Sequence, residues 1–112
     1  LCAGIYSVGM FVYRRHTPIK VGILHSLTGY MALSERSVIE ATLLAIEEIN
    51  ASGGLLGRKI EPIVVDGASD PEIFEQQTTM LIKEKKVDAV FGGGTSASRK
   101  QIKKIIEEYN HI

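Results

Sequence analysis

Hydrophobic and polar positions follow two alternating patterns along most of this chain. Three short runs rich in β-branched residues, IKVGILH (19–25), KIEPIVVDG (59–67) and VDAVFG (87–92), are bounded by Gly, Pro, Ser and Asp. Such runs predict buried strands, and the stretches between them, where apolar residues recur every three or four positions, predict helices. The predicted order is β-α-β-α-β-α. This order is typical of an α/β fold with a parallel, doubly wound sheet and right-handed crossovers.

The first predicted helix has two candidate caps and a well-defined end. Ser37 with Glu40 fits a capping box, and Ser34 is a second candidate N-cap. The glycines of NASGG end the helix. The residues expected to face the core are Val38, Ile39, Thr42, Leu43, Ile46 and Ile49.

The other two predicted helices also carry their own signals. Asp70 followed by Pro71 predicts a capped start for the second, which runs to about Lys85. Ser96 or Ser98 is the expected cap of the third. The expected inward residues are Phe74, Thr78, Leu81 and Ile82 in the second helix and Ile102, Ile105, Ile106 and Tyr109 in the third. The expected solvated face of the third is Lys100, Lys103, Lys104, Glu107 and Glu108.

The sheet order follows from one proline. Pro62 cannot donate to a ladder, so its strand should lie at an edge, with the first strand central and the third on its other side. Ligands of such sheets bind beyond the carboxyl ends of the strands, where the strand order reverses. The loops HSLTGY (25–30) and GGGTSAS (92–98) flank that point, and DGASD (66–70) lies beside them.

The glycine loop at 92–98 favours binding of a small acceptor group. Glycine lets a ligand approach the backbone, and the first N–H groups of the following helix are free and carry partial positive charge. Ser96 or Ser98 either caps this helix or donates to a ligand oxygen, which suits a carboxylate, an amide or a phosphate. Alternatively, the glycines only let the strand turn tightly into its helix.

Nucleotide-binding motifs fit less well. Gly92-x-Gly94-x-x-Ala97 matches the dinucleotide fingerprint formally, but that motif belongs on the first strand of its unit, with an acidic residue about 20 positions later. A P-loop would need G-K-[ST], which is absent here. We therefore expect no nucleotide and no other cofactor.

Composition narrows the function classes. The formal net charge is +0 and basic residues are interspersed with acidic ones, which argues against nucleic acid as a partner. The single cysteine, Cys2, indicates neither a disulfide nor a metal site. His25 and Ser26 are adjacent on a strand end and point apart, so they make a poor base and nucleophile. We expect no enzyme, no catalytic residues and no metal.

The first residues differ from the rest. LCAGIYSVGMFVY (1–13) is apolar, uncharged and followed by RRH. It is shorter than the ~20 residues that span a bilayer, but as the end of a longer segment it fits a membrane anchor or signal core. We therefore divide the chain into an apolar segment, 1–15, and a globular part, 16–112.

Residues 19–112 resemble the type I periplasmic solute-binding proteins through SLTG, EEIN-x-x-GG-x-LGR, DGASD and TSASRK. Within that family it looks closest to the urea and short-chain amide branch. The resemblance implies a two-lobed clamshell closing on a small polar ligand, of which this chain is an incomplete first lobe. A fourth strand would follow EEYNHI, and the chain alone would bind no ligand tightly.

The resemblance also implies site residues. Ser96 would hydrogen-bond the ligand amide, with Thr95 and Ala97 beside it. The predicted wall from the first loop is Ser26, Thr28, Gly29 and Tyr30. Gly94 stands where the branch usually has a stacking Trp or Tyr, and Gly93 stands where it usually has Cys.

The function implied by the resemblance is an extracytoplasmic receptor for urea, a short-chain amide or an amino-acid-like solute, at the periplasmic face of the membrane. Its partner would be the permease of an ABC importer. The alternative from another class is the ligand-sensing ectodomain of a membrane-anchored signalling protein, such as a histidine kinase or chemoreceptor, with a signalling module as its partner.

Overall fold

The computed structural model describes residues 17–112, in which strands and helices alternate. The elements are β1 (Ile19–His25), α2 (Ala32–Ala51), β2 (Ile60–Asp66), α3 (Pro71–Lys83), β3 (Ala89–Gly92) and α4 (Ser96–Glu108). The predicted β-α-β-α-β-α order is confirmed. The predicted apolar segment, 1–15, lies outside the described residues. Among the helices of residues 17–112, none has the length and hydropathy of a membrane span.

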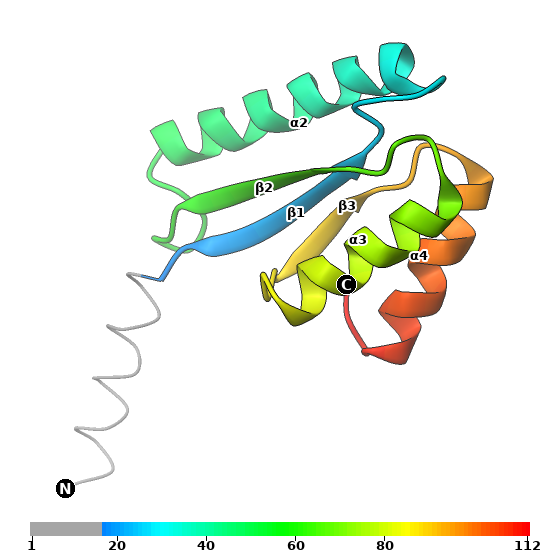
Figure 1. Cartoon of the computed structure of the whole chain (residues 1–112). Helices are drawn as coiled ribbons and strands as arrows, with labels where there is room; N and C mark the ends of the chain where they lie inside the picture. Colours follow the sequence, from blue (N-terminus) through cyan, green and yellow to red (C-terminus); the bar gives the residue numbers. More distant parts are fainter. Residues whose placement is uncertain (1–16) are drawn as a thin grey trace, which may run out of the picture.

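The three strands form one parallel sheet in the order β2-β1-β3. Ile19 pairs with Ile60 and Val21 with Ala89, which sets the register on the two sides of β1. The central position of β1 and the edge position of the Pro62 strand are confirmed. Because all strands run the same way, their carboxyl ends meet at one end of the sheet, where the loops to all three helices begin (Figure 1).

One helix covers one face of the sheet, and two cover the other (Figure 1). Under α2 the buried cluster is Val21, Ile23, Ile39, Ile46 and Ile60. On the opposite face, towards α3 and α4, it is Leu24, Phe74, Leu81 and Val87. Burial of each of these side chains contributes roughly 1.5–3 kcal/mol. The odd-numbered residues of β1 join the first cluster and Leu24 joins the second, as the two-residue period of a strand requires.

The free edge of β2 is covered at one point by a side chain. The Asn50 amide, at the end of α2, donates to the carbonyl oxygen of Ile60 and accepts from its N–H, both at 2.8 Å. At the opposite edge of the sheet, in β3, the Val90 N–H donates to the carbonyl oxygen of Ile112 at 3.0 Å.

The beginning of α2 differs from the prediction. Its N-cap is Met31, and the hydroxyls of Ser34 and Ser37 donate to carbonyls three residues back inside the helix, so both predicted caps are wrong. The helix starts earlier because the Met31 N–H donates to Ser69 Oγ, and the Ala32 N–H to the Gly29 carbonyl. A contact distant in sequence thus takes over the capping.

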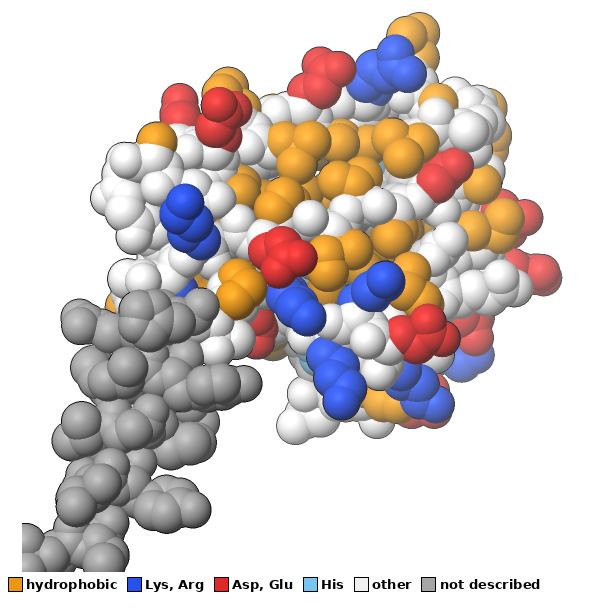
Figure 2. All heavy atoms as spheres, turned by 60° about the vertical axis from the view of Figure 1, so that its left-hand side comes forward, with side chains coloured by type: hydrophobic (Ala, Val, Ile, Leu, Met, Phe, Trp, Pro, Cys, Tyr) orange, Lys and Arg blue, Asp and Glu red, His pale blue; other side chains and the backbone are white. Residues whose placement is uncertain are grey.

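Exposure of α2 differs too. Val38 is 46% and Ile49 38% exposed, although both were expected inward. Ile39 and Ile46 are buried as predicted. Val38 and Ile49 are not, because a single helix on this face of the sheet buries only the narrow stripe of residues that meets the strands. Apolar side chains are also visible between scattered Lys, Arg, Asp and Glu on the face drawn in Figure 2, which shows no continuous basic stripe.

The predicted start of α3 is confirmed, because Asp70 accepts from the Glu72 N–H at 2.9 Å with Pro71 in the first turn. The cap of α4 is Thr95, whose Oγ1 accepts from the Ser98 N–H at 3.1 Å, so neither predicted serine is the cap. Thr95 has extended backbone, which a cap requires, whereas Ser96 and Ser98 are already helical. The predicted charged face of α4 is exposed.

Candidate functional site

Three loops meet at the carboxyl ends of the strands, and we call this end of the sheet the rim. The Gly67 N–H donates to the His25 carbonyl at 2.9 Å, which joins the β2 loop to the β1 loop. The Gly93 N–H donates to the Leu24 carbonyl at 3.2 Å, which joins the β3 loop to the same strand. The rim is therefore formed side by side by loops that are far apart in sequence, as the parallel sheet predicts.

Asp66, at the end of β2, organises one half of the rim. Its carboxylate accepts from the Leu27 N–H at 2.7 Å, from the Ala68 N–H at 2.8 Å, and from Thr28 through both N–H (3.2 Å) and Oγ1 (2.6 Å). Burial alone would raise the pKa of Asp66, but the bonds from the Thr28 hydroxyl and from the backbone of Ala68, Leu27 and Thr28 outweigh it and lower the pKa. Asp66 therefore remains ionised and holds the β1 loop against β2.

Ser26 and Ser69 complete this half. Ser26 is 1% exposed, and its Oγ accepts from the Ser69 N–H at 3.0 Å. Ser69 Oγ in turn donates to the Thr28 carbonyl at 2.9 Å. Gly29 has φ +85°, and its missing side chain leaves room for Ser69 Oγ. The hydroxyls of Ser26 and Thr28, both predicted to line the cleft, thus have partners within the protein, while Tyr30 is 79% exposed.

The glycine loop after β3 passes close to other parts of the chain. A Cβ on Gly92 would collide with the backbone carbonyl of Leu24. Gly93 has φ +81°, a backbone conformation that glycine adopts readily. A Cβ on Gly94 would collide with a carboxylate oxygen of Glu35. Contacts or backbone conformation within the protein therefore explain each glycine. As a result, no side chain of residues 92–94 covers the backbone of this loop.

The first turn of α4 has free donors at the same loop. Within the described residues, no acceptor contacts the N–H groups of Ser96 and Ala97, which precede the first bond of the helix. Ser96 Oγ accepts from Arg99 Nη2 at 3.1 Å, so its own proton is available to another group. Arg99 Nη1 also donates to the carbonyls of Gly93 (3.2 Å) and Gly94 (3.3 Å). Two N–H groups, a hydroxyl proton and a guanidinium are therefore close together, a set suited to a carboxylate.

Arg99 and Glu35 are the rim residues that sequence reasoning did not single out. Glu35 was not singled out, although its spacing from the apolar residues of the first predicted helix places it on the same side as they are. It lies four residues before Ile39 and is 3% exposed on the side of α2 that packs on the sheet. An acidic residue in register with an apolar stripe is the signal that would have found it.

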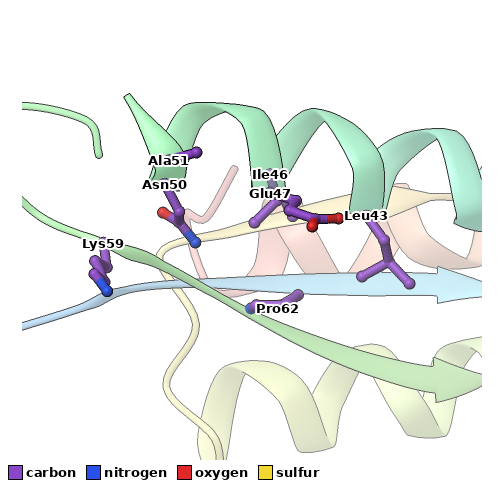
Figure 3. A pocket seen from close by; sticks show the side chains of 7 residues that line it. All are labelled: Leu43, Ile46, Glu47, Asn50, Ala51, Lys59 and Pro62. Carbon is purple, nitrogen blue, oxygen red and sulfur yellow. The ribbon is translucent and has the colours of Figure 1, made fainter. Parts of the chain in front are cut away.

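A separate hollow lies at the other end of the sheet, between α2 and β2 (Figure 3). Its volume is ≈ 420 Å³. The lining residues are Leu43, Ile46, Glu47, Asn50, Ala51, Lys59 and Pro62. The Asn50 amide already bonds Ile60, and the strand ends here are the amino ends. The rim has the free donors, whereas this hollow has mainly apolar walls, so the rim remains the candidate site.

Comparison with known proteins gives one family. The profile of a family described as "Periplasmic binding protein domain" matches residues 19–112. The Leu/Ile/Val-binding protein BraC3 of Rhizobium johnstonii is 35% identical over 72 residues, which are 64% of this chain and 20% of that relative.

Solved structures agree. The branched-chain amino acid transporter substrate-binding protein LivJ of Streptococcus pneumoniae, in complex with isoleucine, superposes with a TM-score of 0.80 at 30% identity, over 82% of this chain and 26% of that one. A solute-binding protein of an ABC transporter from R. palustris, in complex with benzoate, gives a TM-score of 0.75 at 28% identity, over 85% and 26%. The match thus spans only about a quarter of these longer chains.

Proposed function

The chain belongs to the periplasmic binding protein family, and we propose that it forms part of the first lobe of an extracytoplasmic receptor that delivers a small solute to an ABC importer. The proposal places the receptor in the periplasm, with the importer's permease as its protein partner. Nucleic acid is not expected as a partner, and residues 1–13 are the proposed membrane anchor or signal. The rim described above supplies one wall of the ligand cleft.

The proposed ligand is a small carboxylate, in particular an amino acid. The observation that carries this is the group of free donors at the start of α4, where Ser96 Oγ accepts from Arg99 and keeps its proton for the ligand. The ligands bound in the two solved relatives named above, isoleucine and benzoate, share a carboxylate group. Urea has none, and no relative named above is described as a urea or amide binder. The urea and short-chain amide assignment is therefore not supported.

Individual residues have different proposed roles. Ser96 and Ala97 bind the carboxylate through hydroxyl and N–H groups, Thr95 caps their helix, and Gly94 keeps the approach open. Ser26, Thr28 and Gly29 shape the β1 loop through their internal contacts, whereas Tyr30, which is exposed, contacts the ligand from the side. The sensory ectodomain remains an alternative without a supporting relative among those named.

The test is a binding panel on the complete receptor that contains these residues. Isothermal titration calorimetry with L-leucine, L-isoleucine, benzoate, urea and isobutyramide separates the ligand classes. We expect saturable binding of at least one carboxylate and none of urea or isobutyramide. Binding of urea or isobutyramide alone would overturn the proposed ligand class and return the chain to the amide branch.

A further inference from the structure

The end of the sheet opposite the rim, where the strands begin, is formed by three segments of the chain, and we call it the base (Figure 1). The segments are residues 17–20 around the start of β1, 52–59 between α2 and β2, and 84–88 between α3 and β3. The Arg58 side chain donates to the Thr17 carbonyl at 2.8 Å, and the Lys20 N–H donates to Asp88 Oδ2 at 2.9 Å. The two loops of the base are therefore tied to the residues where the described chain begins.

The 52–59 loop contains a tight turn that exposes two leucines. Leu55 and Arg58 exchange two backbone hydrogen bonds, from the Leu55 N–H at 2.7 Å and from the Arg58 N–H at 2.9 Å. Between them, Leu56 and Gly57 have φ +53° and +73°, a conformation for which such turns favour Asn, Asp and Gly. Leu56 is nonetheless 82% exposed and Leu55 49%. Neither the backbone of this turn nor packing within residues 17–112 explains why its tip is apolar.

The same end of the sheet is positively charged. The three segments of the base contain five basic and two acidic residues: Lys20, Arg58, Lys59, Lys85 and Lys86, and Glu84 and Asp88. Their net charge is therefore +3, whereas that of the whole chain is +0. Exposed leucines beside exposed lysines match the two components of an anionic bilayer, which are its acyl chains and its negatively charged headgroups.

The base also lies next to the apolar start of the sequence. Residues 1–13 are followed by Arg14, Arg15 and His16, and the described chain begins with Thr17 in the base. An extended chain spans at most ~3.6 Å per residue, so an anchor that ends at residue 13 keeps Thr17 within about 15 Å of it. Such a short connection brings the base, and with it the turn at Leu56, to the membrane surface.

We propose that the base is a membrane-docking surface, at which Leu55 and Leu56 enter the interface of an anionic bilayer while the lysines of the base contact the headgroups. The inference rests on the function proposed above, in which residues 1–13 are the anchor, and adds an orientation to it. The rim lies at the other end of the strands, so the proposed ligand site opens away from the bilayer.

The experiment uses the complete receptor with residues 1–13 retained, in vesicles of phosphatidylcholine and phosphatidylglycerol. The fluorophore NBD is attached through Leu56→Cys or, as the matched control, through Leu33→Cys, a 91% exposed leucine in the first turn of α2 beside the rim. All other cysteines, including Cys2, are replaced by serine. Nitroxide groups on the lipid acyl chains quench NBD that enters the bilayer, flotation measures attachment to the vesicles, and thermal unfolding checks that each variant is folded.

We expect quenching by about half or more at position 56 and little at position 33, because apolar groups of an interfacial element enter the headgroup and acyl boundary by ~5–10 Å. Combining Lys59→Gln, Lys85→Gln and Lys86→Gln, or using phosphatidylcholine alone, should reduce this quenching about twofold, since the attraction to anionic lipid is lost. A label at the exposed Ser52→Cys keeps both leucines in place. There, Leu56→Asn should lower the quenching although asparagine suits the positive φ of the turn.

Flotation separates this inference from the function on which it rests. A receptor that floats with the vesicles but shows no quenching at position 56, or equal quenching at positions 56 and 33, would overturn the docking surface alone. Blue-shifted emission from position 56 without vesicles would do the same, because another part of the receptor would then cover the turn. A receptor that does not float would overturn the proposed anchor and the inference with it, while calorimetry with L-leucine still tests the solute-binding function.

Discussion

The two sides of β1 end in loops of opposite character. On the β2 side, Asp66 alone accepts four hydrogen bonds, and the Ser69 N–H donates to Ser26 Oγ, which joins the β2 loop to the β1 loop. On the β3 side, one backbone bond, from Gly93 to Leu24, joins the glycine loop to β1, and the first N–H groups of α4 have no acceptor in the described part of the chain. Parallel strands bring both loops to the rim, but the β2 side uses more of its polar groups to hold its loop against β1. The β3 side keeps the Ser96 and Ala97 N–H groups free at the start of α4, and there we expect the ligand.

The largest expected effect is on the β2 side. Asp66→Ala should lower the free energy of unfolding by about 2 kcal/mol or more, because several hydrogen bonds to a charged group disappear together. Urea denaturation of the complete receptor measures this, with Glu84→Ala, at an exposed position, as the control. Equal stability of the two variants would contradict the assignment of Asp66 as the organiser of the β1 loop.

The free energy of unfolding should also depend on acidic pH through Asp66. The pKa of Asp66 is lowered in the folded chain, so its contribution to stability is fully present above the ordinary carboxyl value of roughly 3.9 and is lost as the pH falls through the lower, folded pKa. Unfolding free energies measured from neutral pH down to the acid limit should therefore fall less steeply in Asp66→Asn than in the wild type. Parallel curves would show that the carboxylate is not linked to folding.

The β3 side should respond in binding rather than in stability. Ser96→Ala should weaken binding of the carboxylate ligand at least about tenfold, because it removes a hydroxyl donor to a charged group. Its unfolding free energy should stay within about 0.5 kcal/mol of the wild type, since Ser96 is exposed. Calorimetry and urea denaturation test both statements, with Ser52→Ala as the control; unchanged affinity would remove Ser96 from the site.

A smaller effect is expected at Arg99. Arg99→Lys keeps the charge but loses the planar fork that reaches the Gly93 carbonyl and Ser96 Oγ together, so we expect a loss of roughly threefold in affinity. Lys100→Arg is the matched control on an exposed neighbour. If Arg99→Lys binds the ligand as the wild type does, the orientation of the Ser96 hydroxyl does not depend on the guanidinium.

The sequence predicted the elements and their order because those depend on local patterns. IKVGILH is a strand at the residues predicted, and Pro62 correctly placed β2 at the edge. The caps of α2 and α4 were missed for different reasons. Met31 is capped through Ser69, which is 38 residues away, and no local pattern contains that contact. At α4, three hydroxyl residues compete, and only the backbone conformation of Thr95 distinguishes it.

The candidate site could be located from the sequence, but its internal partners could not. Parallel strands necessarily bring the Ser26 and Gly94 loops to one end of the sheet. Whether the Ser26 hydroxyl faces a ligand or Ser69 depends on the path of the β2 loop, where Ala68 and Ser69 both adopt positive φ. Glu35 meets Gly94 only because α2 starts early enough to bring its first turn over the sheet.

The Asn50 amide on Ile60 has a consequence for association between molecules. In a strand, the N–H and C=O of one residue point to the same side and those of the next residue to the other. Ile60 directs both groups outward to Asn50, so Pro62, two positions on, also faces outward and has no N–H to offer. Intermolecular β-pairing through β2, a common route to fibrils, is therefore blocked at two successive outward positions of the strand.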